Sequence, residues 1–271
     1  MRLVTIRTPD GTRAGRLEGD RIVPLIAPDV AAVLEAGVEN VGDGGAPVDA
    51  ADVDLAPVVP RPSKIICLGL NYRSHIEEMG AELPEHPTLF AKFPAALIGG
   101  RDPICLPGTS SAVDWEGELA FVVGTRVRNA SADEALAAIG GYTICNDVSM
   151  RDWQWRTSEW LQGKTWEGST PLGPALVTPE EVDHAADLLL RCEVDGDVMQ
   201  EARTSDLLFK PADIVRYVST VVTLEPGDVV STGTPAGVGA GMQPPRFLRP
   251  GQIVRTSIEG LGELVNECVK S

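Results

Sequence analysis

The stretch DWEGELAFVVG, residues 114–124, sets the expectation for both the fold and the site. Its apolar run from Leu119 onward predicts a buried β-strand, with acidic residues at the start. Because side chains alternate along a strand, Glu116 and Glu118 point to the same face. Two like charges on one face repel each other, and a hard cation such as Mg2+ relieves that repulsion. A bare Glu-x-Glu also describes an ordinary solvated strand face, so this pattern alone does not assign a metal.

A third carboxylate strengthens the metal interpretation. The stretch GYTICND, residues 141–147, predicts a second apolar strand, and Asp147 ends it. Functional side chains concentrate where strands give way to loops, so Asp147 suits the same site. Three hard oxygen ligands suit a hard cation such as Mg2+. A zinc site is disfavoured, because none of the three histidines is paired at ligand spacing.

Composition and apolar runs predict a mixed α+β fold that is dominated by strands. Aromatic residues make up 5% of the chain, while 28 glycines and 21 prolines favour short strands and tight turns. Helices are expected at residues 131–140, where Ser131 and Glu134 form a capping box, and at residues 210–222. Strands of the larger part are expected at residues 64–69, 118–124, 142–149, 188–196, 228–233 and 252–269.

Two domains are expected, divided near residue 60. Residues 1–60 read as a small α/β domain with short strands and one helix. Pro57, Pro60 and Pro62 indicate an extended connector before the catalytic domain at residues 61–271.

The charge of the chain limits its partners. A formal net charge of −16 without a cluster of Lys or Arg argues against nucleic acids and anionic membranes. An acidic surface also repels an anionic substrate, which therefore needs a local positive group such as Lys, Arg or a metal ion. The first residues lack an apolar signal core, and no apolar run approaches 18 residues. A cytoplasmic location is expected.

Several further side chains are candidates for catalysis or binding. His75 and Glu78 are three residues apart, so on a helical turn the carboxylate would raise the basicity of the imidazole, which suits a general base. Arg151 and Lys164 offer positive charge to a carboxylate or a developing enolate. Taken alone, a surface histidine with an incidental ion pair is the commoner explanation of His75 and Glu78, and ordinary surface charge is the usual role of Arg and Lys. The glycine-rich stretch STGTPAGVG, residues 231–239, either approaches a ligand closely or forms a plain tight turn.

Five segments together resemble the fumarylacetoacetate hydrolase family, in particular its branch of acylpyruvate hydrolases and 2-hydroxyhepta-2,4-diene-1,7-dioate isomerases. The resemblance covers roughly residues 63–270 and rests on DWEGELAFVVG, GYTICNDVSMRDWQ, GKTWEGSTPLGP, TLEPGDVVSTGTPAGVG and IEGLGELVN, in that order. It implies a β-roll or β-sandwich catalytic domain that forms a homodimer. It also implies Mg2+ or Mn2+ held by Glu116, Glu118 and Asp147.

The resemblance implies further roles by position. His75 and Glu78 match a pair that activates water. Residues that contact an oxo acid are matched by Arg151, Gln154, Lys164 and Thr234, and Lys164 is expected to act in catalysis by stabilising an enolate. The chain departs from the family pattern at Leu70, at Trp166 and in TSDLLF, residues 204–209, and these departures concern the identity of the substrate rather than the metal site.

The leading hypothesis is hydrolysis of a C–C bond in an acylpyruvate-type 2,4-dioxo acid through an enolate, with His75 and Glu78 activating water. Decarboxylation of oxaloacetate passes through the same enolate, and isomerisation of a 2-hydroxydiene dioate needs only proton transfer. The sequence does not separate these three reactions. An alternative of another class is a non-catalytic protein that binds an oxo acid, for which a water-activating pair would serve no purpose.

Overall fold

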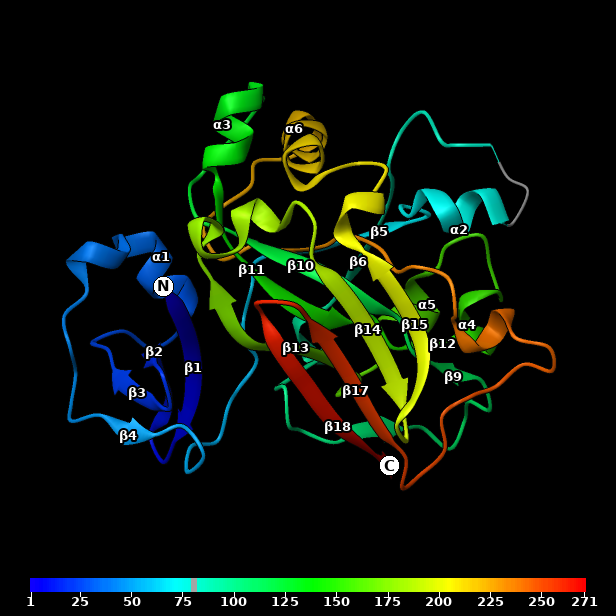
Figure 1. Ribbon diagram of the computed structural model, residues 1–271, viewed down its shortest axis with the longest axis horizontal. Helices are drawn as coiled ribbons and strands as arrows, with labels where there is room; N and C mark the ends of the chain where they lie inside the picture. Colours follow the sequence, from blue (N-terminus) through cyan, green and yellow to red (C-terminus); the bar gives the residue numbers. More distant parts are fainter. Residues whose placement is uncertain (79–81) are drawn as a thin grey trace.

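The computed structural model describes residues 1–78 and 82–271, and within these residues strands dominate (Figure 1). The strands form sheets of eleven, five and two strands. Of the helices described, α6 (Pro211–Val221) spans 11 residues and the others are shorter. The expected fold, a mixed α+β class dominated by β-structure, is confirmed. No helix in residues 1–78 and 82–271 is long and apolar enough to cross a membrane.

The eleven-stranded sheet is the largest of the three sheets. Its strands follow the order β4-β3-β2-β1-β13-β11-β10-β16-β5-β6, with β7 beside β13. Neighbours are antiparallel except for the pairs β16–β5 and β13–β7. The bounds are β1 (Arg2–Thr8), β2 (Gly11–Glu18), β3 (Arg21–Pro24), β4 (Val48–Asp49), β5 (Ile65–Gly69), β6 (Thr88–Lys92), β7 (Leu97–Ile98), β10 (Gly117–Val123), β11 (Ile139–Asn146), β13 (Thr170–Val177) and β16 (Val229–Ser231).

The five-stranded sheet packs against the larger one, through contacts such as those of β14 with β10 and of β18 with β13. Its order is β15 (Asp197–Arg203), β14 (Leu189–Val194), β17 (Ile253–Ile258), β18 (Gly262–Lys270) and β8 (Ile104–Leu106). The third sheet pairs β9 (Val113–Asp114) with β12 (Ser149–Met150). The stretch 252–269, expected as one strand run, is a hairpin of β17 and β18 (Figure 1). Gly260 and Gly262 adopt positive φ at its turn, which glycine tolerates without steric cost.

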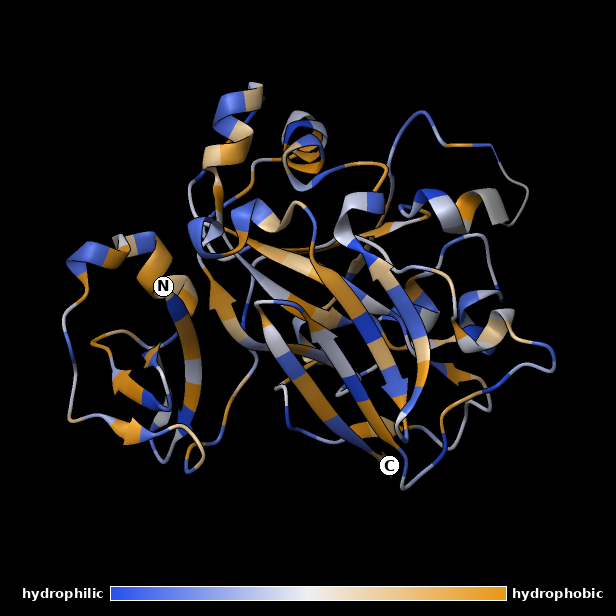
Figure 2. Ribbon diagram, viewed as in Figure 1, coloured by the Kyte–Doolittle hydropathy of each residue, from blue (hydrophilic) through white to orange (hydrophobic). Residues whose placement is uncertain are grey.

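Strand β10 lies at the centre of the fold, and all of its residues are buried. Leu119 and Phe121 face the core between the two larger sheets, while Ala120 and Val122 face a second core on the other side. This alternation follows from the two-residue repeat of a strand. Figure 2 shows the resulting apolar bands through the middle of the molecule. A strand buried on both faces explains why the run that follows the acidic residues is continuously apolar.

The helices begin and end where local signals place them. Helix α3 (Ala132–Ala137) follows the capping box of Ser131 and Glu134, as expected, but it ends before residue 140 because Ile139 begins β11. Helix α6 begins at Pro211, whose missing N–H suits the first turn, and it lies within the expected range. The other helices are α1 (Val30–Ala36), α2 (Arg73–Glu78), α4 (Arg151–Gln154) and α5 (Leu161–Lys164). Single 3-10 turns cover Val38–Asn40, Pro94–Ala96, Thr204–Asp206 and Gly239–Gly241, and the 3-10 segment Pro179–Ala185 is interrupted by a kink.

The first 60 residues share both a sheet and a core with the rest of the chain. Strand β1 pairs with β13, with Leu3 opposite Leu176. Leu3 also belongs to the apolar cluster that contains Ala120 and Val122 of β10. The expected division into residues 1–60 and 61–271 stays a prediction. Because the two parts share a core, we expect them to unfold together.

We expect Leu3→Ala to lower the free energy of unfolding by about 3 kcal/mol, the cost of a cavity in a packed core. All five tryptophans lie beyond residue 60, so their fluorescence reports only on the larger part. Denaturant unfolding followed by tryptophan fluorescence and by circular dichroism should therefore shift together. Ile26→Ala, at a side chain that is 72% exposed, is the control and should change little. An unshifted fluorescence transition would show that residues 1–60 unfold on their own.

Candidate metal centre and active site

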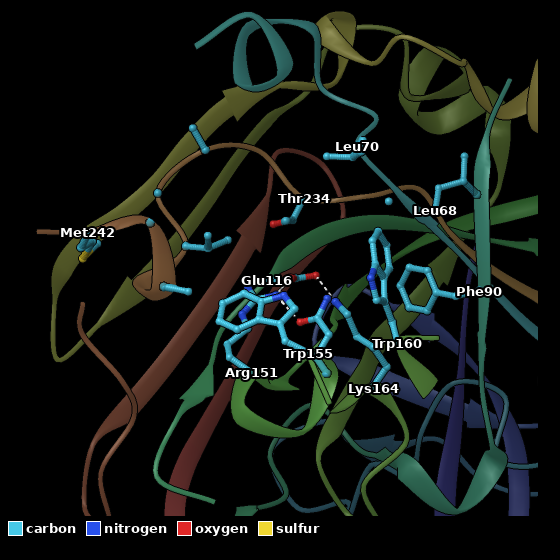
Figure 3. Close-up of a pocket in the computed structure, with 17 residues that line it drawn as sticks. Leu68, Leu70, Phe90, Glu116, Arg151, Trp155, Trp160, Lys164, Thr234 and Met242 are labelled. Atoms are coloured by element: carbon cyan, nitrogen blue, oxygen red, sulfur yellow. Dashed lines mark hydrogen bonds and ion pairs between the residues drawn. The ribbon is translucent and has the colours of Figure 1, made fainter. Parts of the chain in front are cut away.

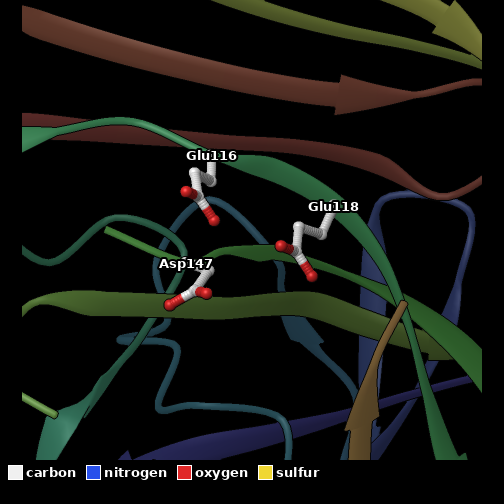
Figure 4. Close-up of side chains that lie close together, drawn as sticks. All are labelled: Glu116, Glu118 and Asp147. Atoms are coloured by element: carbon white, nitrogen blue, oxygen red, sulfur yellow. The ribbon is translucent and has the colours of Figure 1, made fainter. Parts of the chain in front are cut away.

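The pairing of β10 with β11 brings three carboxylates together. Glu118 lies in β10 opposite Cys145 of β11, and Glu116 immediately precedes β10. Asp147 follows the last residue of β11, and its N–H donates to the Glu116 carbonyl oxygen at 2.8 Å. One oxygen from each of the three carboxylates lies within 4.8 Å of the others, and all three side chains are buried (Figure 4). The structure therefore places the three predicted ligands in one cluster.

Three buried cations surround this cluster. Lys164 Nζ lies 2.6 Å from Glu116 Oε2 and 2.8 Å from Asp147 Oδ2. Arg151 Nη1 lies 2.6 Å from Glu116 Oε1. Lys92 Nζ contacts Asp147 Oδ1 on its other side. Burial of a charge is costly unless it is paired, so these contacts are what make the cluster compatible with the core.

The cations set the ionisation of Asp147. Burial alone would raise the pKa of this carboxyl, but Lys164 and Lys92 outweigh burial and lower its pKa to about 2. For Lys164, burial works against the charged form, yet Asp147 and Glu116 raise its pKa above the ordinary value. Both groups are therefore charged near neutral pH.

Glu118 has a different environment. Its Oε2 accepts hydrogen bonds from Ser231 Oγ at 2.5 Å and from the Gly233 N–H at 2.8 Å. Its Oε1 is buried and has no hydrogen-bond partner in the described structure. Burial, together with the charges of Asp147 and Glu116, raises the pKa of Glu118 well above its usual range.

The Glu118 oxygen tests whether a metal ion fits this site. A buried oxygen without a partner costs free energy, and a cation bound by the cluster would satisfy it. Asp114 accepts from Arg151 Nε at 2.9 Å, and with it the four carboxyl groups of the site outnumber its three basic side chains by one. Ionised Glu118 therefore leaves one negative charge without a partner, which a bound cation would offset. The donors are all hard oxygen atoms, which Mg2+ and Mn2+ prefer. The residues present therefore fit a divalent ion, while the identity of that ion stays a prediction.

Through Glu116, the cluster borders a cavity of about 650 Å3. Glu116, Arg151, Gln154, Lys164 and Thr234 contribute its polar side chains, and Figure 3 shows Glu116, Arg151 and Lys164 together in the centre of the view. The Gln154 side-chain oxygen accepts from Arg151 Nη1 at 2.9 Å, whereas Arg151 Nη2 is buried without a partner in the described structure. Arg151 thus has a free donor for an anion.

The helices α4 and α5 position these groups. Arg151 and Gln154 belong to α4, and Lys164 is the last residue of α5. A Cβ at Gly163 would lie 2.5 Å from the backbone nitrogen of Gln154, so only glycine allows the two helices to approach this closely. The glycine in QGKT therefore helps to place Lys164 beside Glu116.

The structure leaves one predicted pair untested. His75 and Glu78 lie on α2, but their side chains fall outside the described residues. The segment just before α2, from Leu68 to Leu70, lines the cavity. The proposed roles of both residues stay predictions, as do those of the other site residues.

Sequence reasoning missed two charged residues of the site. Lys92, the last residue of β6, pairs with Asp147, and a single lysine among apolar neighbours in TLFAKF was the available signal. Asp114 pairs with Arg151, and it also accepts from the N–H groups of Gly239 and Ala240 at 2.7 and 2.9 Å. Its position two residues before Glu116 was the available signal, but the sequence interpretation considered only the Glu-x-Glu pattern.

Known proteins resemble this chain in sequence and in fold. The chain is 44% identical to a mitochondrial oxaloacetate tautomerase of Rattus norvegicus over 216 residues, 79% of this chain and 69% of that protein. Among solved structures, a fumarylacetoacetate hydrolase of Exiguobacterium antarcticum is 33% identical with a TM-score of 0.88. A 5-carboxymethyl-2-hydroxymuconate delta-isomerase of Mycobacterium smegmatis is 37% identical with a TM-score of 0.85. Both alignments cover 100% of each chain.

The family assignment follows from these matches. The rat relative is described as mitochondrial, so the cytoplasmic location expected for this chain stays a prediction. Residues 64–269 match the family described as Fumarylacetoacetate (FAA) hydrolase, C-terminal. The resemblance noted in the sequence is thereby confirmed, and this chain belongs to the fumarylacetoacetate hydrolase family.

Proposed function

We propose that this chain forms and stabilises the enolate of a small 2-oxo acid, and that keto–enol tautomerisation of oxaloacetate is one reaction it catalyses. The observation that carries the proposal is the pair of buried cations, Arg151 and Lys164, which both touch Glu116 at the cavity wall. The name of the rat relative supports oxaloacetate as the first substrate to test.

The metal ligands in this proposal are Glu116, Glu118 and Asp147, with Mg2+ or Mn2+ as the ion. Lewis acidity toward the oxygens of an oxo acid is what such an ion supplies when bound. The local excess of negative charge in the cluster is smaller than the charge of a divalent ion. The loaded site would therefore attract an anion to a protein whose net charge is −16.

The residues of the chain have distinct roles in the proposed reaction. The free Nη2 donor of Arg151 binds the carboxylate of the oxo acid. The ammonium group of Lys164, whose pKa is raised, stabilises the negative charge that develops on the enolate oxygen. Gln154 and Thr234 orient the substrate from the cavity wall. Tautomerisation breaks the C3–H bond and forms an O–H bond at C2. Water takes the proton from C3 and the enolate oxygen takes a proton back from water, so the step does not require a general base from the chain.

Hydrolysis of a C–C bond in an acylpyruvate is the second candidate function. The similarity to the fumarylacetoacetate hydrolase of Exiguobacterium antarcticum, over the full length of both chains, favours it. In this reaction water attacks the C4 carbonyl carbon, and we propose His75 with Glu78 as the base that deprotonates that water. The C3–C4 bond then breaks, which releases a carboxylic acid and the enolate of pyruvate, and that enolate takes a proton at C3. Decarboxylation of oxaloacetate needs no attacking water and is measured in the same assays as a further outcome.

We expect Glu118→Gln to weaken Mn2+ binding by more than about tenfold, since even an outer partner of a ligand contributes about 10–100-fold. Isothermal titration calorimetry measures this affinity, with Glu35→Gln on the exposed face of α1 as the control. Because the pKa of Glu118 is raised, its ionised form disfavours the metal-free fold, and the variant should melt no lower than the wild type. Unchanged Mn2+ affinity would remove Glu118 from the ligand set.

We expect Lys164→Met to reduce kcat for oxaloacetate tautomerisation by about 100-fold to 1,000-fold, as for loss of a donor to a developing oxyanion. The absorbance of the enol in buffer with Mg2+ follows the reaction. Lys270→Met, at the exposed end of β18, serves as the matched control and should retain full activity. A variant that still binds Mn2+ and keeps wild-type kcat would contradict the role of Lys164.

We expect His75→Ala to abolish acylpyruvate hydrolysis while tautomerisation of oxaloacetate continues, because only hydrolysis requires an activated water. Spectrophotometric assays of both reactions on the same preparation make the comparison, and Glu78→Ala should behave in the same way. Equal loss of both reactions would refute this division of labour. A protein that binds oxalate with Mg2+ yet turns over no oxo acid would instead support a non-catalytic binding protein.

A further inference from the structure

We infer that the wall of the cavity away from Glu116 binds an apolar acyl group. The preferred substrate is then a 2,4-dioxo acid that carries an aryl or branched alkyl group at C4. This inference rests on the proposed function, because it assumes that the oxo-acid end of the substrate occupies the metal cluster.

The polar side chains of the cavity gather at one end. Arg151 and Lys164 both contact Glu116, and Gln154 accepts from Arg151. Thr234 Oγ1 donates to the carbonyl oxygen of Gly117 at 3.0 Å. Apart from the tryptophan indoles, each polar side chain among the described lining residues contacts residue 116 or 117, or contacts Arg151, which itself contacts Glu116. These groups can bind only one polar end of a ligand.

The remaining wall is apolar and partly open. Its large side chains include Leu70, Phe90, Trp155, Trp160, Val238 and Met242. Trp155 is 64% exposed and Leu70 is 42% exposed, so apolar surface at the cavity remains uncovered. In Figure 3, Trp160 and Phe90 stand on one side of the central charged group and Met242 on the other. Covering such surface with an apolar group is favourable roughly in proportion to the area removed from water.

The aromatic part of this wall begins directly beside the catalytic end. The Phe90 ring lies 5.0 Å from Lys164 Nζ, and its centroid lies 5.5 Å from that of Trp160 in an edge-to-face arrangement. A Cβ at Gly69 would lie 2.4 Å from the Trp160 ring, so glycine leaves the space that this indole occupies. A substrate bound at Lys164 therefore extends onto aromatic surface as soon as it leaves the charged end.

Size and charge both favour an apolar tail over a second carboxylate. The volume of about 650 Å3 lies in the range of pockets that hold drug-sized ligands, about 300–1,000 Å3, and exceeds what a four-carbon acid fills. A carboxylate on the far wall would meet no cation among the described lining residues. Loss of its hydration without a partner would weaken binding.

The test compares three 2,4-dioxo acids that share the oxo-acid end and differ at C4: methyl, phenyl, and a vinyl group that ends in a carboxylate. Isothermal titration calorimetry on the full-length protein with Mg2+ measures each Kd. We expect the phenyl compound to bind at least about tenfold more tightly than the methyl compound, the lower end of the discrimination by apolar pockets. We also expect it to bind more tightly than the carboxylate compound. Equal affinities, or tightest binding of the carboxylate compound, would overturn the inference.

Two variants locate the effect on the wall. Leu70→Arg places a cation there and should shift the ratio of the phenyl Kd to the carboxylate Kd at least about tenfold toward the carboxylate compound. Trp155→Ala should reduce the preference for phenyl over methyl. Val221→Arg adds the same charge at the end of α6, where the side chain is 68% exposed, and should leave both ratios unchanged. Folded variants that keep the wild-type ratios would place the acyl group elsewhere.

The outcomes separate this inference from the proposed function. A phenyl preference in binding, with no turnover of oxaloacetate or of any 2,4-dioxo acid, would refute the enzymatic proposal and support the apolar site. Turnover of oxaloacetate without any phenyl preference would support the enzymatic proposal and refute the apolar site.

Discussion

The repulsion among three buried carboxylates that lie close together is the constraint on which the rest of this structure depends. Glu116, Glu118 and Asp147 repel one another in a region where water cannot screen them. Lys92, Lys164 and Arg151 offset that repulsion, and they come from β6, α5 and α4, which are separate parts of the chain. Removing one partner of a buried pair typically costs about 3–5 kcal/mol, so these elements must assemble together.

The same charges connect the fold to the proposed chemistry. Of the three carboxylates, Asp147 is held ionised by two lysines, whereas burial and like charges disfavour ionisation of Glu118. Glu118 also carries the buried oxygen that lacks a hydrogen-bond partner in the described residues. The cluster therefore fits a cation, and of its three basic residues Arg151 and Lys164 line the cavity in which we propose that an anionic substrate binds. An acidic chain can in this way bind an acidic ligand.

The cavity divides the recognition of substrate between two kinds of surface. Its charged end would serve all three candidate reactions, because tautomerisation, decarboxylation and hydrolysis each pass through an enolate of a 2-oxo acid. Its apolar wall, with Phe90 and Trp160 beside Lys164, is where discrimination between acids would arise. The proposed metal ligands therefore indicate the type of reaction. The apolar wall is the part of the site where binding affinity would differ from one acid to another.

The sequence by itself determined what depends on local periodicity and on recognisable motifs. It predicted the strand class, the shared face of Glu116 and Glu118, the capping box of α3, and the ordered motifs that indicated the family. Only the tertiary structure decided the hairpin within residues 252–269, the pairing of β1 with β13, and the contact of Lys92 with Asp147. Strand alternation acts between neighbours along the chain, whereas the partner of a buried charge depends on which distant strands pair and in which register.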